Sequence, residues 1–536
     1  MTIKNLSKIH SAELEGINAK LIEVEVDMNV GLHSFNIVGL ADKALNEAKE
    51  RVNSALKNSG AKPPNRENRR ITINLAPADV KKAGSHYDLA IALGYLLASK
   101  QIMPFESADK VFVGELALDG RLRPVNGALN IAQMARDLKF KYLFLPAQNA
   151  DEASAIQGIK IVALGTLGDA IKILSGDVEA GECVVTSATT NTASAAAPTI
   201  AATKNNGSFP DLSEIVGQEN AKRALTIAAA GNHNLLMMGQ PGVGKSMLAR
   251  ALAGILPDLT TPEAIEVTKI WSAAGLSPGR IMEQRPFRAP HQTISITGLI
   301  GGGSDPRPGE ISLAHRGVLF LDELPEFPRN ALEALREPME SGTIRIVRTK
   351  RGFSFPARFS LVAAMNPCPC GYYGDPEKEC KCAAYEVLKY QKKVSGPLLD
   401  RIDLQIIVGR VKIEDLRRGN EQEGESNPSK SGTRRGATST DVKQLVTTAR
   451  DRQLFRFKNT DIATNAEMSS REARSMARLD ATAERFLETF DKSRISPRGY
   501  YRILKVARTI ADLEARDRVS AEHLAEAFSY RLRGET

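Results

Sequence analysis

Cysteine is scarce in this sequence: the 536 residues contain five, and four of them fall between Cys368 and Cys382. A disulfide framework would be spread along a secreted chain, so that class of protein is excluded and a reducing compartment fits better. No run of 18 apolar residues occurs, so no membrane-spanning helix and no membrane partner are expected. The N-terminus also lacks the apolar core of a signal peptide, which predicts a cytoplasmic protein.

Length and composition describe an ordinary globular protein of several domains. A chain of 536 residues is too long for one hydrophobic core and predicts three or four domains. Hydrophobic residues make up 42% and charged residues 25%, which excludes a wholly disordered or fibrous chain. The net charge of +9 permits an anionic partner without demanding one.

The first block, residues 1–180, has the pattern of a mixed α/β or α+β domain. Alternation around Val24 and Val26 predicts a strand, and a second strand is expected over 71–75. Helical spacing follows over 45–56, with Gly60 as a stop signal, and another helix is expected over 88–99.

Two segments of biased composition separate the remaining blocks. Residues 181–210 are rich in Ala, Thr and Ser and predict a flexible linker. A polar stretch at 412–440 predicts a surface loop between an α/β block at 211–411 and a helical block at 441–536.

The strongest motif is a phosphate-binding loop between an apolar strand and a helix. Its glycines let backbone N–H groups turn toward phosphates, and the following helix adds its N-terminal partial charge. Lys245 is expected to reach the β- and γ-phosphates of ATP, and Ser246 to ligate Mg²⁺. The nucleotide-binding residues are predicted to be Gly239, Gln240, Pro241, Gly242, Val243, Gly244, Lys245 and Ser246, together with Asp322.

Two further apolar runs end in polar residues that suit the same site. Asp322 and Glu323 follow the run 318–321, and Asn366 follows the run 361–365. Chemistry in open α/β sheets gathers at the carboxyl edge of the strands. Asp322 is therefore expected to hold the magnesium shell, Glu323 to polarise the attacking water, and Asn366 to orient that water.

Additional motifs carry a family resemblance. From about Phe209 onward the chain resembles AAA+ ATPases of the magnesium-chelatase and minichromosome-maintenance branch, and nearly the whole chain resembles the ComM/YifB family. The segments that carry it are Arg285-Pro-Phe-Arg-Ala-Pro-His291, Gly301-Gly-Gly-Ser304, Pro308-Gly-Glu-Ile-Ser-Leu-Ala-His315, Leu335-Arg-Glu-Pro-Met-Glu-Ser-Gly342 and Asn366-Pro-Cys-Pro-Cys-Gly371.

The resemblance implies a fold and an assembly. The fold would be an α/β protein with a Lon-protease-like (S5-like) N-terminal domain, an AAA+ P-loop core and a C-terminal helical lid. Subunits would form a ring, a hexamer, with ATP at their interfaces. Arg401 matches the family's arginine finger, and Arg498 lies where the lid carries a second sensor.

A basic hairpin is predicted just before the Asn366 strand. Residues 344–358 alternate apolar and basic, turn near Gly352, and contain no acid. In related helicases a hairpin here enters the pore, so Arg348, Lys350 and Arg351 are candidates to contact the DNA backbone. An exposed basic hairpin without a ligand is the alternative interpretation.

Three functions fit these motifs to different degrees. The family resemblance implies an ATP-driven DNA helicase that binds single-stranded or branched DNA. It would promote branch migration in recombination during natural transformation. A magnesium-chelatase-like or MoxR-like ATPase would instead remodel a protein partner. A Lon-like peptidase is disfavoured, because His86 stands where the nucleophilic serine belongs, Leu129 replaces the lysine, and Ser85 is out of register.

The cysteines Cys368, Cys370, Cys380 and Cys382 have the spacing C-x-C-x₉-C-x-C. Four thiolates can close a tetrahedral shell around Zn²⁺ and leave no position for water, which predicts a structural metal rather than a catalytic one. An iron–sulfur cluster also uses four thiolates, and a group of reduced thiols is the third alternative.

Overall fold

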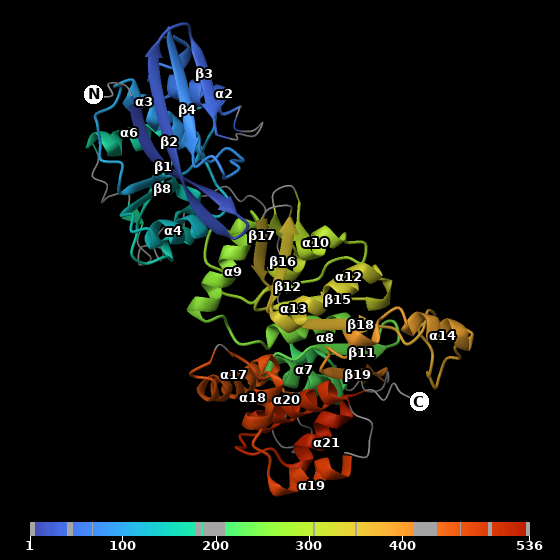
Figure 1. Ribbon diagram of the computed structural model, residues 1–536. Helices are drawn as coiled ribbons and strands as arrows, with labels where there is room; N and C mark the ends of the chain where they lie inside the picture. The colour runs from blue at the N-terminus through green and yellow to red at the C-terminus, as the bar shows by residue number, and fades with distance from the viewer. Residues whose placement is uncertain are drawn as a thin grey trace, which may run out of the picture.

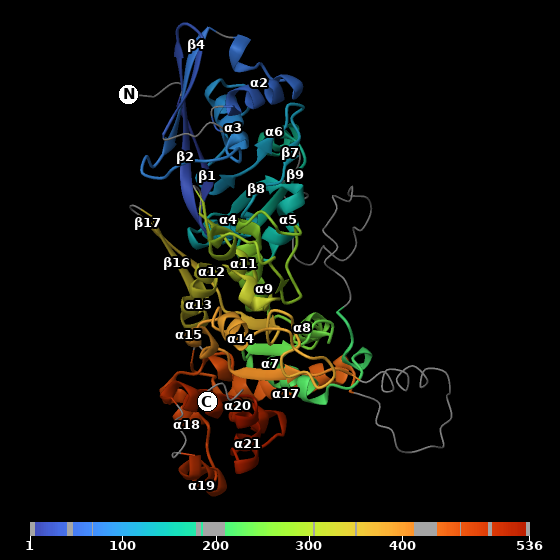
Figure 2. The same cartoon turned by 90° about the vertical axis from the view of Figure 1, so that its right-hand side faces the viewer.

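The protein extends along one axis, with an N-terminal region at one end and helices at the other (Figure 1). The computed structural model describes residues 6–39, 45, 47–66, 68–177, 184–185, 209–303, 306–348, 351–411, 437–460, 462–490 and 496–531. Figure 2 shows the same order from the side: the N-terminal sheet above, the region that contains β11 and α8 in the middle, and the C-terminal helices below.

The N-terminal region is built on an eight-stranded mixed sheet. Alternating apolar residues put one face of β2 into the core, where Val24 and Val26 are fully buried. The strand order is β10-β9-β8-β5-β1-β2-β4-β3, with β1 and β2 antiparallel. These strands are β1 (Leu6–Glu15), β2 (Asn18–Val30), β3 (Ser34–Val38), β4 (Arg69–Ala76), β5 (Lys110–Phe112), β8 (Tyr142–Pro146), β9 (Lys160–Leu164) and β10 (Val184–Val185).

Helices cover this sheet, and a small hairpin lies beside it. The strands and helices expected from the pattern are confirmed, and the helix expected over 45–56 corresponds to α2, which begins at Ala48. Within the expected linker 181–210, Val184 and Val185 instead pair with β9, and residues 181–183 and 186–208 lie outside the described residues. The remaining elements are α2 (Ala48–Asn58), η1 (Pro64–Arg66), α3 (Asp88–Ala98), β6 (Glu115–Leu116), β7 (Leu122–Arg123), α4 (Ala128–Asp137), α5 (Ala147–Ser154) and α6 (Leu167–Ser175).

The middle region contains a five-stranded sheet in which neighbouring strands are parallel. Its order is β12-β15-β18-β11-β19, and helices cover its faces (Figure 1). Apolar runs form β15 and β18 because strands buried on both faces need no polar alternation. The strands are β11 (Leu235–Gly239), β12 (Phe287–Arg288), β15 (Val318–Leu321), β18 (Ser360–Met365) and β19 (Leu404–Val408).

Helices and short turns complete the middle region. The phosphate-binding loop lies between β11 and α8, as the motif predicts. The elements are η4 (Leu212–Glu214), α7 (Glu219–Gly231), α8 (Lys245–Gly254), α9 (Thr261–Ala273), α10 (Ile296–Ile300), β13 (Gly301–Gly302), β14 (Arg307–Pro308), α11 (Glu310–Leu313), η5 (Leu324–Glu326), α12 (Arg329–Ala334), α13 (Arg336–Ser341), α14 (Ala384–Gln391) and α15 (Gly396–Leu399).

The predicted hairpin is present between β15 and β18. Strands β16 (Thr343–Arg348) and β17 (Arg351–Pro356) pair in antiparallel register, with Thr343 opposite Pro356. Ile344 and Phe355 anchor its base in the core, whereas Val347 near the tip is 82% exposed. The hairpin is therefore a protrusion fixed at its base.

The C-terminal region is helical, as its periodicity predicts. Ser496 caps α20 by accepting a hydrogen bond from the Gly499 N–H, and one face of α20 packs into the same core as the P-loop strand. The elements are α17 (Ser439–Arg456), η6 (Asn465–Glu467), α18 (Ser470–Met476), α19 (Ala481–Phe490), α20 (Pro497–Leu513) and α21 (Ala521–Ser529). Residues 412–436, which make up most of the expected polar loop, lie outside the described residues.

A polar joint connects the N-terminal and middle regions. The buried carboxylate of Glu152 accepts hydrogen bonds from the hydroxyls of Ser272, at 2.7 Å, and Ser277. Backbone bonds add to this joint: Gly127 N–H donates to Ser272 O at 3.0 Å and Glu152 N–H to Gly279 O at 3.1 Å. Burial raises the pKa of Glu152, and the two hydroxyls oppose that rise.

The turn between β1 and β2 touches the hairpin from the N-terminal side. A Cβ atom on Gly16 would lie 3.2 Å from the Phe353 ring, and Ile17 packs against the cluster that holds the hairpin base. The hairpin base is therefore held by both regions. Among the described helices, none has the length and apolar character needed to cross a bilayer.

Candidate nucleotide site

The phosphate-binding loop adopts a backbone that favours glycine. Gly242 and Gly244 have φ angles of +79° and +90°, in the left-handed region that L side chains rarely enter. At Gly239 a Cβ atom would lie 2.5 Å from the carbonyl oxygen of Val408 on the neighbouring strand. Glycine is therefore favoured at Gly242 and Gly244 by the backbone conformation and at Gly239 by the close neighbouring strand. The loop leads directly into α8.

Lys245 is held at the inner edge of this loop. Its ammonium group donates hydrogen bonds to the carbonyl oxygens of Gly239, at 2.6 Å, and Gln240, at 2.8 Å. A third bond, 3.0 Å long, goes to the side-chain oxygen of Asn366. Burial lowers the pKa of Lys245, while the carboxylates of Asp322 and Glu323 oppose the shift. Two predicted site residues, Lys245 and Asn366, are thus in contact across 121 positions of sequence.

Pro241 and Val243 complete the loop through contacts with other segments. Val243 is buried, and its carbonyl accepts a 2.8 Å hydrogen bond from the side-chain amide of Gln218. Pro241 lies against Gly371, where a Cβ atom would stand 2.5 Å from the proline ring. The cysteine-rich segment therefore packs directly on the phosphate-binding loop.

Ser246 and Asp322 are joined at the start of α8. The serine hydroxyl donates a 2.7 Å hydrogen bond to a carboxylate oxygen of Asp322, and the other oxygen accepts from the Glu323 N–H at 2.9 Å. Asp322 follows β15, Asn366 follows β18 and the loop follows β11, and these three strands are adjacent and parallel. A hydroxyl and a carboxylate at this edge suit Mg²⁺, which prefers oxygen ligands.

Glu323 lies beside this group in an exposed position. Its φ of +50° is in the left-handed region, which is uncommon for a residue with a Cβ atom. Strain of this kind persists where the surrounding structure enforces it, and it gathers at functional sites. The backbone thereby turns away from β15 directly after Asp322 and leaves the Glu323 side chain accessible.

The two predicted arginines meet at a carboxylate that the sequence did not single out. Arg401 and Arg498 both contact the same Glu340 oxygen, at 2.8 Å and 2.6 Å. Arg401 is nearly buried, at 8% exposure, and also donates to Pro397 O at 2.7 Å. Within the described parts of the chain, no contact joins either arginine to Lys245, Ser246 or Asp322. The arginine pair is therefore separate from this chain's own phosphate-binding loop.

The four clustered cysteines converge on one point. All four sulfur atoms lie within 4.8 Å of one another, and the Sγ–Sγ distances are 3.4 Å for Cys368–Cys370, 3.7 Å for Cys368–Cys380 and 3.5 Å for Cys370–Cys380. Tetrahedral zinc with Zn–S bonds of about 2.3 Å spaces its sulfurs about 3.8 Å apart. The donor set therefore fits one zinc ion and is tight for a cluster of several irons.

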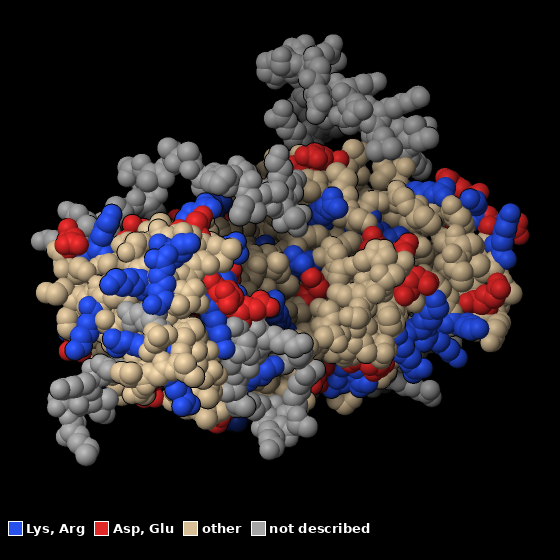
Figure 3. Space-filling model, turned by 90° about the horizontal axis from the view of Figure 1, so that it is seen from above, with Lys and Arg blue, Asp and Glu red and all other residues tan. Residues whose placement is uncertain are grey.

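The DNA-binding prediction concerns the outer end of the hairpin. Arg348 ends β16 and Arg351 begins β17, opposite each other in register, while Lys350 lies outside the described residues. Viewed from above, basic and acidic side chains are interspersed over the molecule (Figure 3).

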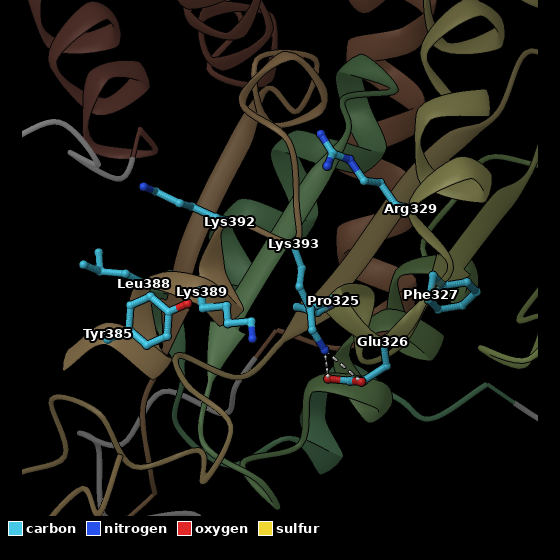
Figure 4. Close-up of a pocket in the computed structure, with 9 residues that line it drawn as sticks. All are labelled: Pro325, Glu326, Phe327, Arg329, Tyr385, Leu388, Lys389, Lys392 and Lys393. Carbon is cyan, nitrogen blue, oxygen red and sulfur yellow. Dashed lines mark hydrogen bonds and ion pairs between the residues drawn. The ribbon is translucent and has the colours of Figure 1, made fainter. Parts of the chain in front are cut away.

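A basic pocket of about 610 Å³ begins at Pro325, two residues after Glu323, and no motif in the sequence indicates it. It lies between η5 and α14, and Figure 4 shows Lys393 reaching across to Glu326, with contacts of 3.1 Å and 3.2 Å. Tyr385 is 71% exposed at its rim. The lining residues are Pro325, Glu326, Phe327, Arg329, Tyr385, Leu388, Lys389, Lys392 and Lys393.

The residues that could have formed a peptidase site have other partners. Ser85 donates its hydroxyl proton to Glu115, and the buried Lys82 donates to the carbonyl of Pro77. Leu129 is fully buried in an apolar cluster. A serine–lysine dyad needs its two members in contact, and here each polar group is held elsewhere.

Comparison with known proteins agrees with this arrangement. Three family profiles match: "Subunit ChlI of Mg-chelatase" over residues 24–149, "Magnesium chelatase, subunit ChlI" over 211–416, and "Magnesium chelatase, subunit ChlI C-terminal" over 436–531. The magnesium-chelatase 38 kDa subunit of Rhodobacter capsulatus is 30% identical over 189 residues, which cover 32% of this chain and 53% of that subunit.

Two relatives match along almost their whole length. The competence protein ComM of Haemophilus influenzae is 42% identical over 532 residues, and the match covers 98% of this chain and 97% of ComM. The YifB protein of Escherichia coli is 42% identical over 529 residues, with coverage of 98% and 97%. The chain therefore belongs to the ComM/YifB family of magnesium-chelatase-like AAA+ ATPases.

Proposed function

We propose that this protein is a cytoplasmic, ATP-driven DNA helicase that assembles as a hexameric ring and promotes branch migration during recombination in natural transformation. One observation carries the proposal: along the chain, the hairpin β16–β17 lies between β15, which Asp322 directly follows, and β18, which Asn366 directly follows. A basic protrusion is thus connected on both sides to strands that end at the nucleotide site. The competence protein ComM, as a full-length relative, favours the same function.

Each side chain at the site has a chemical role in this proposal. Lys245 and the N–H groups of the loop bind the ATP phosphates, and Ser246 and Asp322 hold Mg²⁺. A bound Mg²⁺ neutralises charge that develops on the phosphates. Glu323 polarises the attacking water, and Asn366 orients it while keeping Lys245 in place.

Arg401 and Arg498 serve a neighbouring subunit. Their separation from this chain's own loop supports a site completed by a second copy, because an arginine near the γ-phosphate stabilises the charge of phosphoryl transfer. Arg348, Lys350 and Arg351 then contact the DNA backbone at the tip of the hairpin. We also propose that Cys368, Cys370, Cys380 and Cys382 hold one structural Zn²⁺ that braces the loop against Pro241.

The test is ATP turnover measured without DNA and with single-stranded, duplex or branched DNA, alongside migration of a synthetic junction. We expect branched or single-stranded DNA to raise turnover and ATP to drive junction movement, and the Lys245→Ala variant to do neither. If no DNA changes the rate of ATP turnover and the junction does not move, the helicase proposal is contradicted. That outcome would favour a magnesium-chelatase-like or MoxR-like ATPase acting on a protein.

A further inference from the structure

Glu340 occupies a position that the proposed function leaves unexplained. It lies in the last turn of α13, about half exposed, and one of its oxygens contacts both Arg401 and Arg498. The three residues come from three separate segments: α13, the turn after α15, and the start of α20. One carboxylate therefore joins the central region to the C-terminal helices.

The charges of Arg401, Arg498 and Glu340 allow a phosphate to replace the glutamate carboxylate at the two arginines. Two guanidinium groups repel each other, and a shared carboxylate offsets that repulsion and keeps both pointing at one place. The Nε of Arg401 is buried without a hydrogen-bond partner, so the arginine retains a donor to offer. A terminal phosphate brings more negative charge and three acceptor oxygens, so it can engage both arginines and displace Glu340.

Glu340 is also directly linked to the hairpin. Ser341 donates its hydroxyl proton toward the carbonyl oxygens of Glu337 and Thr343, at 3.0 Å and 2.9 Å. The next residue, Gly342, has a φ of +66°, and its carbonyl accepts a 2.8 Å hydrogen bond from the N–H of Ala357, which directly follows β17 at the hairpin base. The end of α13 and both strands at the hairpin base therefore form one hydrogen-bonded unit.

We infer that Glu340 is a positioning residue that couples the arginine pair to the basic hairpin. The inference rests on the proposed function, in which the pair meets a neighbour's γ-phosphate and the hairpin contacts DNA. When a phosphate binds the two arginines, their ion pairs with Glu340 break. The hairpin base is then no longer held to the arginines through Glu340. Nucleotide state and DNA affinity are then linked, and linkage requires that each ligand changes the other's affinity by the same factor.

The test compares DNA affinity in ADP with that in a slowly hydrolysed ATP analogue. For the wild type we expect the two dissociation constants to differ about fivefold or more, the lower end of ordinary allosteric coupling. In Glu340→Gln, which keeps the side-chain shape and removes the charge, the ratio falls below about twofold while both ligands still bind. Glu340→Asp, which keeps the carboxylate, gives an intermediate ratio.

The matched control is Glu337→Gln, an exposed glutamate one turn earlier on α13, which should keep the wild-type ratio. A Glu340→Gln ratio equal to that of the wild type overturns the inference, and so does a wild type whose DNA affinity ignores nucleotide. Complementation between Arg401→Ala and Lys245→Ala subunits is measured in parallel. If complementation succeeds while the ratio is unchanged, the coupling role of Glu340 fails and the shared site stands. If complementation fails, the shared site fails too.

Discussion

The two halves of the proposed ATPase site differ in how much of each one chain completes. The phosphate-binding half is joined within the chain: Lys245 contacts Asn366, and Ser246 contacts Asp322. The arginine half instead faces a glutamate, and Arg401 keeps a buried donor unused. Under the proposed function, the first half binds nucleotide within one chain, whereas the arginine half acts on the nucleotide of a second subunit. The difference supports the proposal that two chains together complete one catalytic site.

The largest effect is expected from breaking the phosphate-binding half. Lys245→Ala removes the cation that contacts the phosphates, so ATP turnover should fall to background and nucleotide affinity should drop. Glu323→Gln should also stop turnover but retain nucleotide binding, because this change leaves the phosphate-binding loop intact. Turnover and equilibrium binding of a fluorescent nucleotide distinguish the two. Wild-type turnover in Glu323→Gln would show that this carboxylate does not polarise the water.

A smaller effect is expected at the hairpin, which lies outside both halves. Lys350→Ala combined with Arg351→Ala removes two cations, so the slope of log affinity against log salt should decrease by about 1.8 for duplex DNA. Affinity should weaken for every sequence alike, since phosphate contacts carry no base information. ATP turnover without DNA reports whether the variant is folded. DNA affinity equal to that of the wild type would remove the hairpin from the binding surface.

The cysteine cluster packs against the phosphate-binding loop through the contact between Gly371 and Pro241. Elemental analysis should find about one zinc per chain. Replacing Cys380 by serine should lose that zinc, lower the unfolding temperature and reduce turnover less than Lys245→Ala does. A metal-free protein with four titratable thiols and full activity would contradict the structural metal.

The smallest effect is expected at the joint formed by Glu152. Its folded-state pKa is raised by burial, so ionisation costs stability as pH rises from the unfolded value of about 4.3 through the folded pKa. Glu152→Gln removes that cost, so the melting temperature of the variant relative to wild type should increase over this pH range. A difference that stays constant with pH would show that the joint carries no such linkage.

The residues predicted for the phosphate-binding half lie together in the structure because they follow local rules. Gly242 and Gly244 have positive φ angles, which favour glycine. Asp322 and Asn366 follow apolar runs that form neighbouring parallel strands. Their meeting at one sheet edge follows from the strand order, so each motif could be placed without knowing the rest.

The sequence did not reveal the residues whose role depends on distant partners. Glu340 meets Arg498 across 158 positions, and Glu152 meets Ser272 across 120. Glu340 lies within the segment Leu335–Gly342 that carries the family resemblance, but nothing in that segment indicates its partners, and no pattern distinguishes Glu152 from a solvated surface residue. Long-range pairing of this kind depends on how separate regions pack, which periodicity and spacing do not encode.

The most direct test of the two-chain site is a mixing experiment. Arg401→Ala and Lys245→Ala subunits, each inactive alone, are combined at varied ratios, and ATP turnover is measured after mixed rings are demonstrated. We expect partial recovery that peaks at intermediate ratios, where an intact loop of one subunit meets an intact arginine of the next. Mixed rings without recovery at any ratio would contradict the two-chain site.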